Sequence, residues 1–248
     1  MLDYSKLKLD KFLDGKINIY QPINGYKSGT DAILLASLLS NAKNKQINIA
    51  EIGCGVGVAS IALLSRLENL NILGIEKNNY FYNICKVNII NNKFKNSTMD
   101  VVNLNILDLP NEYQNIFDAV MMNPPYFKNN ISNFNLKNYG NIEEDAKIDD
   151  FISSGFKMLK NYGDLYIIYT SQRIQELLLC LKQNHWGSVE IFPIYSYANK
   201  SATRFLLKAK KLSKGVSKIH FGIIMHNDDK SYTIDAQDIL KKGLSFKI

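Results

Sequence analysis

The chain has 248 residues, of which 46% are hydrophobic, so it can bury the core of one large domain. It has no run of about eighteen apolar residues and its first residues lack an apolar signal core, so neither a membrane helix nor secretion is expected. Three cysteines without a CxxC pair argue against a disulfide framework and a zinc site, and favour a reducing cytoplasm. The net charge of +7 only hints at an anionic partner.

Predicted helices and strands alternate along the chain. The apolar stretch 32–39 follows Thr30 and Asp31, which are predicted to cap a helix. Further helices are expected over 58–67, 78–92, 146–159 and 174–183. Strands are expected at 47–52, 71–76, 99–105, 117–122, 164–170, 189–195 and 203–209, with another at 219–225. This alternation indicates an α/β fold with a mostly parallel, doubly wound sheet.

A glycine-rich turn follows the first of the alternating strands and opens a helix. Gly53, Gly55 and Gly57 permit a tight turn and a close approach of a ligand to the backbone. Glu76 ends the second strand, where a carboxylate can accept hydrogen bonds from both ribose hydroxyls of a nucleoside. The pairing predicts a site for a cofactor that contains adenosine, and a turn used only for packing is the alternative.

The spacing around this turn also resembles a known motif. Glu51 stands two residues before Gly53, as in the first motif of class I S-adenosylmethionine-dependent methyltransferases, whereas Ser60 replaces the third glycine of the dinucleotide pattern. The resemblance implies that Glu51 lies near the methionine end of S-adenosylmethionine. It also implies that the residue closing the third strand accepts the cofactor's adenine amine. That residue is Asn105, whose amide oxygen can accept the bond, or Asp108 if the register differs.

The tetrapeptide Asn123-Pro124-Pro125-Tyr126 follows the fourth strand and resembles the NPPY signature of amino-methyltransferases. The amine of adenine is a poor nucleophile because its lone pair is delocalised into the ring. The side-chain oxygen of Asn123 and the carbonyl oxygen of Pro124 can each accept one amine hydrogen, which directs the lone pair at the methyl group. Pro124 and Pro125 stiffen the loop, and Tyr126 can stack on the base. A proline-rich turn without function is the alternative.

Two further segments carry a resemblance to one family. The stretch 21–35 is similar to the N-terminal motif of bacterial tRNA(Val) adenine-37 N6-methyltransferases, and 199–207 and Tyr232-Thr233 are similar to their later motifs. The resemblance covers roughly residues 10 to 245. It implies that one segment closes over the methionine part of the cofactor, through Lys27, Gly29, Thr30 and Asp31.

The resemblance has consequences for the fold and the activity. It implies a Rossmann-like α/β domain with a mostly parallel seven-stranded sheet and an antiparallel strand near the C-terminus. It divides this single domain into a cofactor-closing segment, a catalytic core and an extension, at 1–45, 46–211 and 212–248. The implied function is N6-methylation of an adenine in tRNA, at position 37 of tRNA(Val), by a cytoplasmic monomer that uses S-adenosylmethionine and no metal.

Basic residues gather in the stretch 200–218, which contains seven of them and no acidic residue. Such a stretch suits the phosphates of an RNA, and binding would then depend strongly on salt. The candidates for RNA contacts are Lys200, Arg204, Lys208, Lys210 and Lys211. A lysine-bearing strand edge that resists aggregation is the alternative. Phe127 and Tyr139 are candidates for the base pocket, although core packing is the commoner role of such residues.

Three other functions compete with RNA methylation. A protein glutamine N5-methyltransferase acting on release factors uses the same tetrapeptide, but usually carries a long helical domain before the glycine turn. A DNA adenine methyltransferase usually needs an extra domain to read base edges. A non-catalytic RNA-binding or assembly factor on a decayed methyltransferase fold would not need an intact glycine turn and tetrapeptide.

Overall fold

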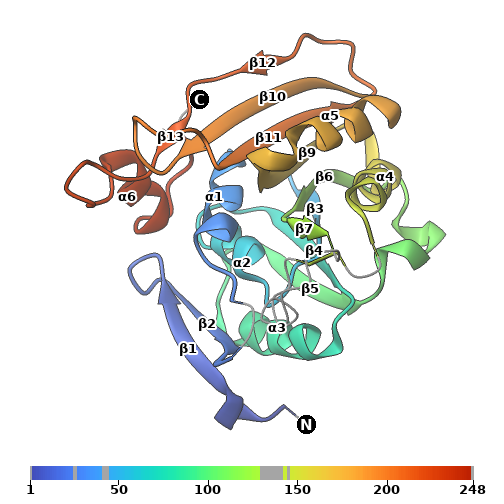
Figure 1. The fold of residues 1–248 in the computed structure, drawn as a ribbon. Helices are drawn as coiled ribbons and strands as arrows, with labels where there is room; N and C mark the ends of the chain where they lie inside the picture. The colour runs from blue at the N-terminus through green and yellow to red at the C-terminus, as the bar shows by residue number, and fades with distance from the viewer. Residues whose placement is uncertain (1, 25–26, 41–44, 129–141, 144–145, 247–248) are drawn as a thin grey trace.

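The computed structural model describes residues 2–24, 27–40, 45–128, 142–143 and 146–246. Seven long strands build its main sheet: β3 (Ile47–Ile52), β4 (Leu70–Glu76), β5 (Thr98–Asn103), β6 (Phe117–Met122), β9 (Leu159–Thr170), β10 (Trp186–Tyr195) and β11 (Arg204–Lys211). Two short strands, β12 (Lys218–Ile219) and β13 (Ile223–Ile224), pair with β10 at the edge. The order is β12-β10-β11-β9-β6-β3-β4-β5, as Figure 1 shows.

The strand directions confirm the predicted fold class. Strands β3, β4, β5, β6 and β9 pair in parallel, and β11 runs antiparallel to both β9 and β10. The predicted antiparallel strand near the C-terminus is therefore present. The described sheet has nine strands, against the seven expected, because the two short edge strands add to the seven long ones.

The edge of the sheet differs from the single strand predicted over 219–225. Two short strands stand there, and they pair with β10 on either side of Pro193. Proline has no N–H for a ladder, so pairing is interrupted at this point. At Gly222 the chain passes so close that an added Cβ would lie 2.3 Å from the carbonyl oxygen of Pro193. The interruption therefore follows from one proline and one glycine that face each other.

Helices cover both faces of the sheet, which makes the fold doubly wound. They are α1 (Thr30–Leu38), α2 (Val58–Leu64), α3 (Asn79–Asn91), α4 (Ile148–Met158), α5 (Ile174–Gln183) and α6 (Ile234–Leu240). One core cluster includes α1, α2, α3 and α6, and a second cluster includes α4 and α5. Single 3-10 turns occur at η1 (Tyr4–Lys6), η2 (Ile106–Asp108), η3 (Asn111–Tyr113) and η5 (Ser171–Arg173). Among the described residues, no helix is both long and apolar enough to cross a membrane.

Several predicted element ends differ from the structure, and two of them lie at the candidate site. Helix α1 begins at Thr30 with Gly29 as its N-cap, so Thr30 and Asp31 lie in the first turn and do not cap it. Strand β5 ends at Asn103, because the side-chain oxygen of Asn105 accepts the backbone N–H of Leu107 at 3.2 Å and starts a 3-10 turn. The side chain of Asp31 is therefore free to turn toward another part of the chain.

A hairpin that the sequence did not predict precedes the main sheet. Its strands are β1 (Leu7–Phe12) and β2 (Ile17–Pro22), which pair antiparallel. Asn88 on α3 and Asn92, the C-cap of this helix, bind the backbone of β2, each accepting one N–H and donating to one carbonyl, at Tyr20 and Asn18 respectively. These side-chain amides continue the ladder in place of a third strand. A short parallel pair, β7 (Phe127–Lys128) and β8 (Ile142–Glu143), follows the tetrapeptide.

Candidate active site

The glycine turn after β3 has two parts with different surroundings. All three glycines have positive φ angles, of 70° at Gly53, 55° at Gly55 and 88° at Gly57, which L side chains rarely adopt. An added Cβ at Gly57 would lie 2.8 Å from the sulfur of Cys85 on α3, so this glycine serves packing. At Gly53 and Gly55 an added Cβ would be in ordinary van der Waals contact, with nearest atoms 3.6 and 3.8 Å away. Gly53 is exposed and Gly55 half-buried, so a ligand can reach the backbone there.

Glu76 holds this turn from the end of β4. One carboxylate oxygen accepts the backbone N–H of Gly55 at 2.9 Å, and the other accepts that of Asn78 at 2.7 Å. The side chain is buried, and burial raises the pKa of its carboxyl above the ordinary value. Carboxylate oxygens have about four acceptor positions in all, so two bonds leave capacity for hydroxyl donors. The carboxylate of Glu76 thus connects the end of β4 with the glycine turn and with the start of α3.

Glu51 is the second buried acid at this end of the sheet. One of its oxygens accepts the backbone N–H of Ser60 at 3.1 Å and also the hydroxyl of Ser60. Burial raises the pKa of the Glu51 carboxyl to about 7, and the negative charge of Glu76 acts in the same direction. Ser60, which departs from the dinucleotide glycine pattern, is therefore the residue that holds Glu51.

The structure brings part of the predicted N-terminal segment to the turn. The hydroxyl oxygen of Ser28 is the nearest atom to a Cβ built on Gly55, at 3.8 Å, so the chain around Gly29 passes beside the turn. Lys27 and Thr30 are exposed there. Gly25 and Tyr26 of the same motif lie outside the described residues.

These surroundings fit an adenosine-containing cofactor. The backbone at Gly53 and Gly55 is accessible to a ligand. Two buried carboxylates stand at the carboxyl ends of neighbouring parallel strands. That edge is where open α/β sheets bind nucleotides. The predicted roles, Glu76 at the ribose hydroxyls and Glu51 near the methionine end of the cofactor, stay predictions. The contacts of Asn105 or Asp108 with the cofactor's adenine stay predictions, and the Asn105 oxygen already accepts one hydrogen bond.

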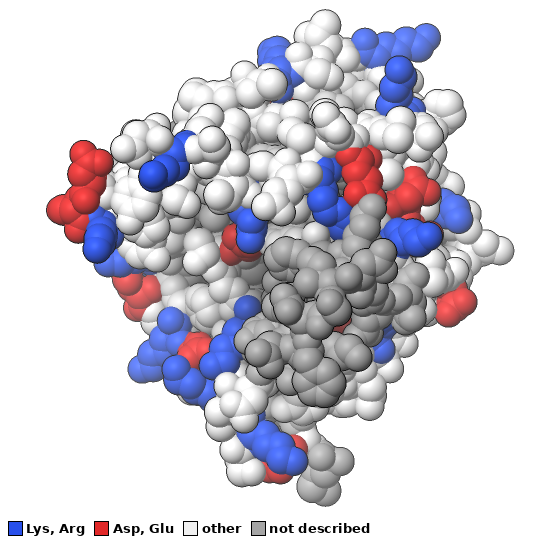
Figure 2. All heavy atoms as spheres, in the orientation of Figure 1, with Lys and Arg blue, Asp and Glu red and all other residues white. Residues whose placement is uncertain are grey.

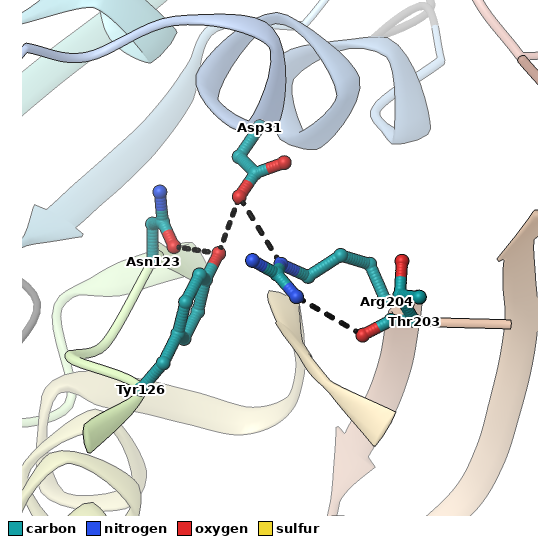
Figure 3. A network of polar contacts seen from close by, with 5 residues as sticks. All are labelled: Asp31, Asn123, Tyr126, Thr203 and Arg204. Atoms are coloured by element: carbon teal, nitrogen blue, oxygen red, sulfur yellow. Dashed lines mark hydrogen bonds and ion pairs between the residues drawn. The ribbon is translucent and has the colours of Figure 1, made fainter. Parts of the chain in front are cut away.

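The predicted tetrapeptide stands at the end of β6, next to β3 in the sheet. Asn123 and Pro125 are half-buried, whereas Pro124 and Tyr126 are buried. The hydroxyl oxygen of Tyr126 lies 2.6 Å from the side-chain oxygen of Asn123 and 2.8 Å from a carboxylate oxygen of Asp31 (Figure 3). The first turn of α1 therefore reaches the tetrapeptide.

Arg204 from the start of β11 completes this group. Its Nε lies 3.5 Å from the same oxygen of Asp31, and its guanidinium lies over the Tyr126 ring at 4.6 Å from the centroid (Figure 3). Arg204 also donates to the carbonyl oxygen of Thr203 at 3.1 Å. The guanidinium thus covers one face of the ring that is predicted to stack on a base, and stacking stays a prediction.

Arg173 and Tyr169 support Tyr126 from β9 and the turn after it. Arg173 donates to the carbonyl oxygen of Tyr126 at 3.4 Å and forms an ion pair with Glu176 at 2.9 Å. The ring of Tyr169 meets that of Tyr126 edge-on, with centroids 5.7 Å apart. No sequence pattern predicts a role for Arg173. Its place just after a strand, at the edge where the site forms, was the one signal available.

The predicted basic surface on β11 is wrong in part. Lys211 is buried at 4% exposure, and its ammonium donates to the carbonyl oxygen of Leu159 at 2.7 Å. Lys208 and Lys210 both pair with Asp164, at 3.6 and 2.9 Å. Successive residues of a strand point to opposite faces, so Lys211 turns away from the face that Arg204, Lys208 and Lys210 share. On the face of the molecule drawn in Figure 2, the basic side chains stand in separate groups, with acidic ones next to several of them.

Two residues of that run remain on the surface or near the tetrapeptide. Lys200 is exposed in the connection before β11. Arg204 is about one-third exposed and belongs to the Asp31 and Tyr126 group. Tyr139 lies outside the described residues, as does the side chain of Phe127.

Comparisons with known proteins agree with this geometry. Residues 27–191, well over half of the chain, match the methyltransferase small domain family. A relative from Pedobacter heparinus, named tRNA1(Val) (adenine(37)-N6)-methyltransferase, is 27% identical over 177 residues, which are 71% of this chain and 73% of the relative.

Solved structures share the fold. A predicted O-methyltransferase from Agrobacterium tumefaciens matches with a TM-score of 0.72 at 22% identity, covering 87% of this chain and 98% of that one. TYW2 of M. jannaschii, solved in complex with AdoMet, matches with a TM-score of 0.55 at 18% identity and covers 83% and 85% of the two chains. The glycine turn is accessible to a ligand and has two buried acids beside it. The family match and this geometry together show that the chain belongs to the methyltransferase small domain family and is an S-adenosylmethionine-dependent methyltransferase.

Proposed function

We propose that the protein methylates the exocyclic N6 of an adenine in tRNA, with adenine 37 of tRNA(Val) as the first substrate to test. One observation carries this proposal: Asn123 and Pro124 stand at the end of β6, beside the strand that leads into the glycine turn. The relative from Pedobacter heparinus has a name that specifies this base and this tRNA. The proposal therefore rests on the place of the tetrapeptide and on a likeness of sequence.

The residues of the tetrapeptide suit a planar amine. The side-chain oxygen of Asn123 and the carbonyl oxygen of Pro124 are acceptors for the two hydrogens of the amine, and holding both turns its lone pair out of the ring's conjugation. S-adenosylmethionine supplies an activated methyl group on sulfur when bound. The stiff Pro124-Pro125 backbone keeps the acceptors in place before the substrate arrives, so less reorganisation is needed during transfer.

An adenine in a stacked anticodon loop has to leave the stack to reach this position. We propose that Glu76 and the Gly53–Gly57 turn hold the nucleoside part of the cofactor, and that Glu51 and the segment around Gly29 hold its methionine part. The carboxyl ends of β3, β4 and β6 lie side by side in the sheet, so cofactor and base meet at one edge. We propose that phosphates are contacted by basic residues at the surface, with the exposed Lys200 and the half-buried Lys210 as candidates and the buried Lys211 left out.

Mass spectrometry of nucleosides tests the proposal. Purified protein is incubated with S-adenosylmethionine and either unmodified tRNA(Val) or the same transcript with guanine at position 37. We expect N6-methyladenosine in the first transcript and none in the second. Transfer of the methyl group to a release-factor glutamine, or no transfer with cofactor bound, would replace the proposal with one of its competitors.

A further inference from the structure

The hydroxyl of Tyr126 faces two acceptors at once. Its oxygen lies 2.8 Å from a carboxylate oxygen of Asp31 and 2.6 Å from the side-chain oxygen of Asn123. A tyrosine hydroxyl has one hydrogen to donate, and neither a carboxylate nor an amide oxygen has one to give back. Two acceptors therefore compete for a single hydrogen in a site where the tyrosine is buried. One of the two short contacts lacks a hydrogen.

The carboxylate is the stronger competitor. Hydrogen bonds to an ionised acceptor are roughly twice as strong as those between neutral groups. The position of Asp31 is fixed by α1 and by Arg204, whose Nε lies 3.5 Å from the same carboxylate oxygen. The ring of Tyr126 is held as well, by the guanidinium of Arg204 over it. The hydroxyl hydrogen thus belongs to Asp31.

The amide of Asn123 is the group that can adapt. A half-turn of this amide leaves its shape almost unchanged and exchanges oxygen for nitrogen. The nitrogen then donates to the hydroxyl oxygen of Tyr126, which can accept while its own hydrogen points at Asp31. In this arrangement the side chains of Asp31, Tyr126 and Asn123 are joined by two hydrogen bonds that each have a donor and an acceptor. The oxygen of Asn123 then points away from the tyrosine.

We propose that Asp31 is a positioning residue which, through the hydroxyl of Tyr126, sets the amide of Asn123 with its nitrogen toward the tyrosine and its oxygen toward the substrate. This inference rests on the proposed function, in which that oxygen accepts a hydrogen of the substrate amine. Arg204 takes part by holding the carboxylate and the ring from β11. The role differs from the cofactor contact that the sequence predicts for Asp31 and from the RNA contact predicted for Arg204.

A double-mutant cycle tests the inference by activity. Tyr126→Phe keeps the ring and removes the hydroxyl, and Asp31→Ala removes the acceptor. Each is expected to lower kcat about ten- to a hundredfold, as small misplacements of catalytic groups do, with KM for tRNA and the Kd for S-adenosylmethionine nearly unchanged. The double variant should be no slower than Tyr126→Phe alone, because Asp31 acts through that hydroxyl. The inference would be overturned if the kcat losses of the two single variants multiply in the double variant, or if Tyr126→Phe keeps full activity.

Two further variants serve as a conservative substitution and a control for the double-mutant cycle. Asp31→Asn is nearly isosteric, so it should preserve the packing of α1, and its amide oxygen can still accept the hydroxyl hydrogen. It should retain more activity than Asp31→Ala. The double variant of Asp31→Asn and Tyr126→Phe should be no slower than Tyr126→Phe alone. Tyr166→Phe is the matched control, since it removes a buried tyrosine hydroxyl from the same strand β9 but in the other core cluster from Tyr126. It is expected to stay near the wild-type rate, and a tenfold loss there would mean that removing any buried tyrosine hydroxyl lowers activity, which would overturn the inference.

NMR detects the hydrogen-bonded connection from Asp31 through Tyr126 to Asn123 without a substrate. The side-chain NH2 resonance of Asn123 is identified by its loss in Asn123→Ala. It is expected to shift in Tyr126→Phe and in Asp31→Ala and to stay in place in Tyr166→Phe. A resonance unmoved by either change would overturn the inference. If the wild-type protein forms no N6-methyladenosine while this resonance shifts as expected, the proposed function has failed and the hydrogen-bonded chain stands.

Discussion

The cofactor end and the tetrapeptide end of the site are built in different ways. Glu76 binds Gly55 across 21 positions of the sequence, and Glu51 binds Ser60 across nine. In contrast, 95 positions separate Asp31 from Tyr126, and 173 separate it from Arg204. The first end is a local unit of strand, turn and helix, whereas the second is assembled only when three distant segments meet. Changes at the two ends should therefore separate binding from transfer.

The largest effect is expected from Asn123→Ala. It removes a preset acceptor for the substrate amine, and loss of one such group typically costs about a hundred- to a thousandfold in rate. The Kd for S-adenosylmethionine, measured by calorimetry, should change little because the local cofactor unit is intact. Asn111→Ala, in the η3 turn, is a matched control that should leave both quantities unchanged. Equal loss of binding and transfer in Asn123→Ala would mean that the two ends are not separate.

Glu51→Gln should produce a pH-dependent change in stability. Burial raises the pKa of Glu51 from 4.5 to about 7, so the folded protein binds a proton that the unfolded chain releases between these values. Stability from this residue is complete below about pH 4.5 and is lost as pH rises toward 7, by an amount on the order of 3 kcal/mol. Glutamine does not ionise and can still accept the N–H of Ser60.

Thermal unfolding without cofactor at pH 5 and pH 8 measures this difference. Relative to wild type, Glu51→Gln is expected to be more stable at pH 8 than at pH 5, and Glu112→Gln in the η3 turn should show no such change. A Glu51→Gln difference that is the same at both pH values would show that the carboxyl titrates normally.

Glu76→Gln tests the same local unit through binding. Glutamine offers one oxygen where the carboxylate offers two, so it cannot hold both Gly55 and Asn78 as well as ribose hydroxyls. The Kd for S-adenosylmethionine should rise about tenfold, while kcat at saturating cofactor stays close to wild type. If kcat falls and the Kd does not change, Glu76 belongs to the transfer end and the ribose contact is misassigned.

The two ends also differ in how far the sequence predicts them. Strands β3 and β6 and helix α5 have the predicted bounds, because strong apolar patterns and a glycine turn fix them locally. The same holds for Glu51 and Glu76, whose place follows from strand ends. No pattern indicates that Asp31 faces Tyr126, since a residue just before an apolar helix looks like a cap. That contact depends on how α1 lies against the sheet.

The basic run shows a second limit of the sequence. Its seven charges were counted along the chain, but a strand sends neighbouring residues to opposite faces. Lys211 consequently points inward, where backbone and side-chain oxygens of Leu159 and Asn115 receive its ammonium. Charge along the sequence predicts a surface only when the residues are spaced to share a face.

The smallest effect is expected away from both ends, from Lys210→Ala. Lys210 pairs with Asp164 at 2.9 Å, so its charge is already partly balanced, and the affinity for tRNA should fall only about twofold. Adding Asp164→Ala restores the local charge and should restore the affinity if Lys210 acts through charge alone. For the single and the double variant, the Kd for tRNA is measured as a function of salt concentration. A lower salt slope that persists in the double variant would instead show that Lys210 contacts a phosphate directly, because each lost phosphate contact reduces the slope by about one.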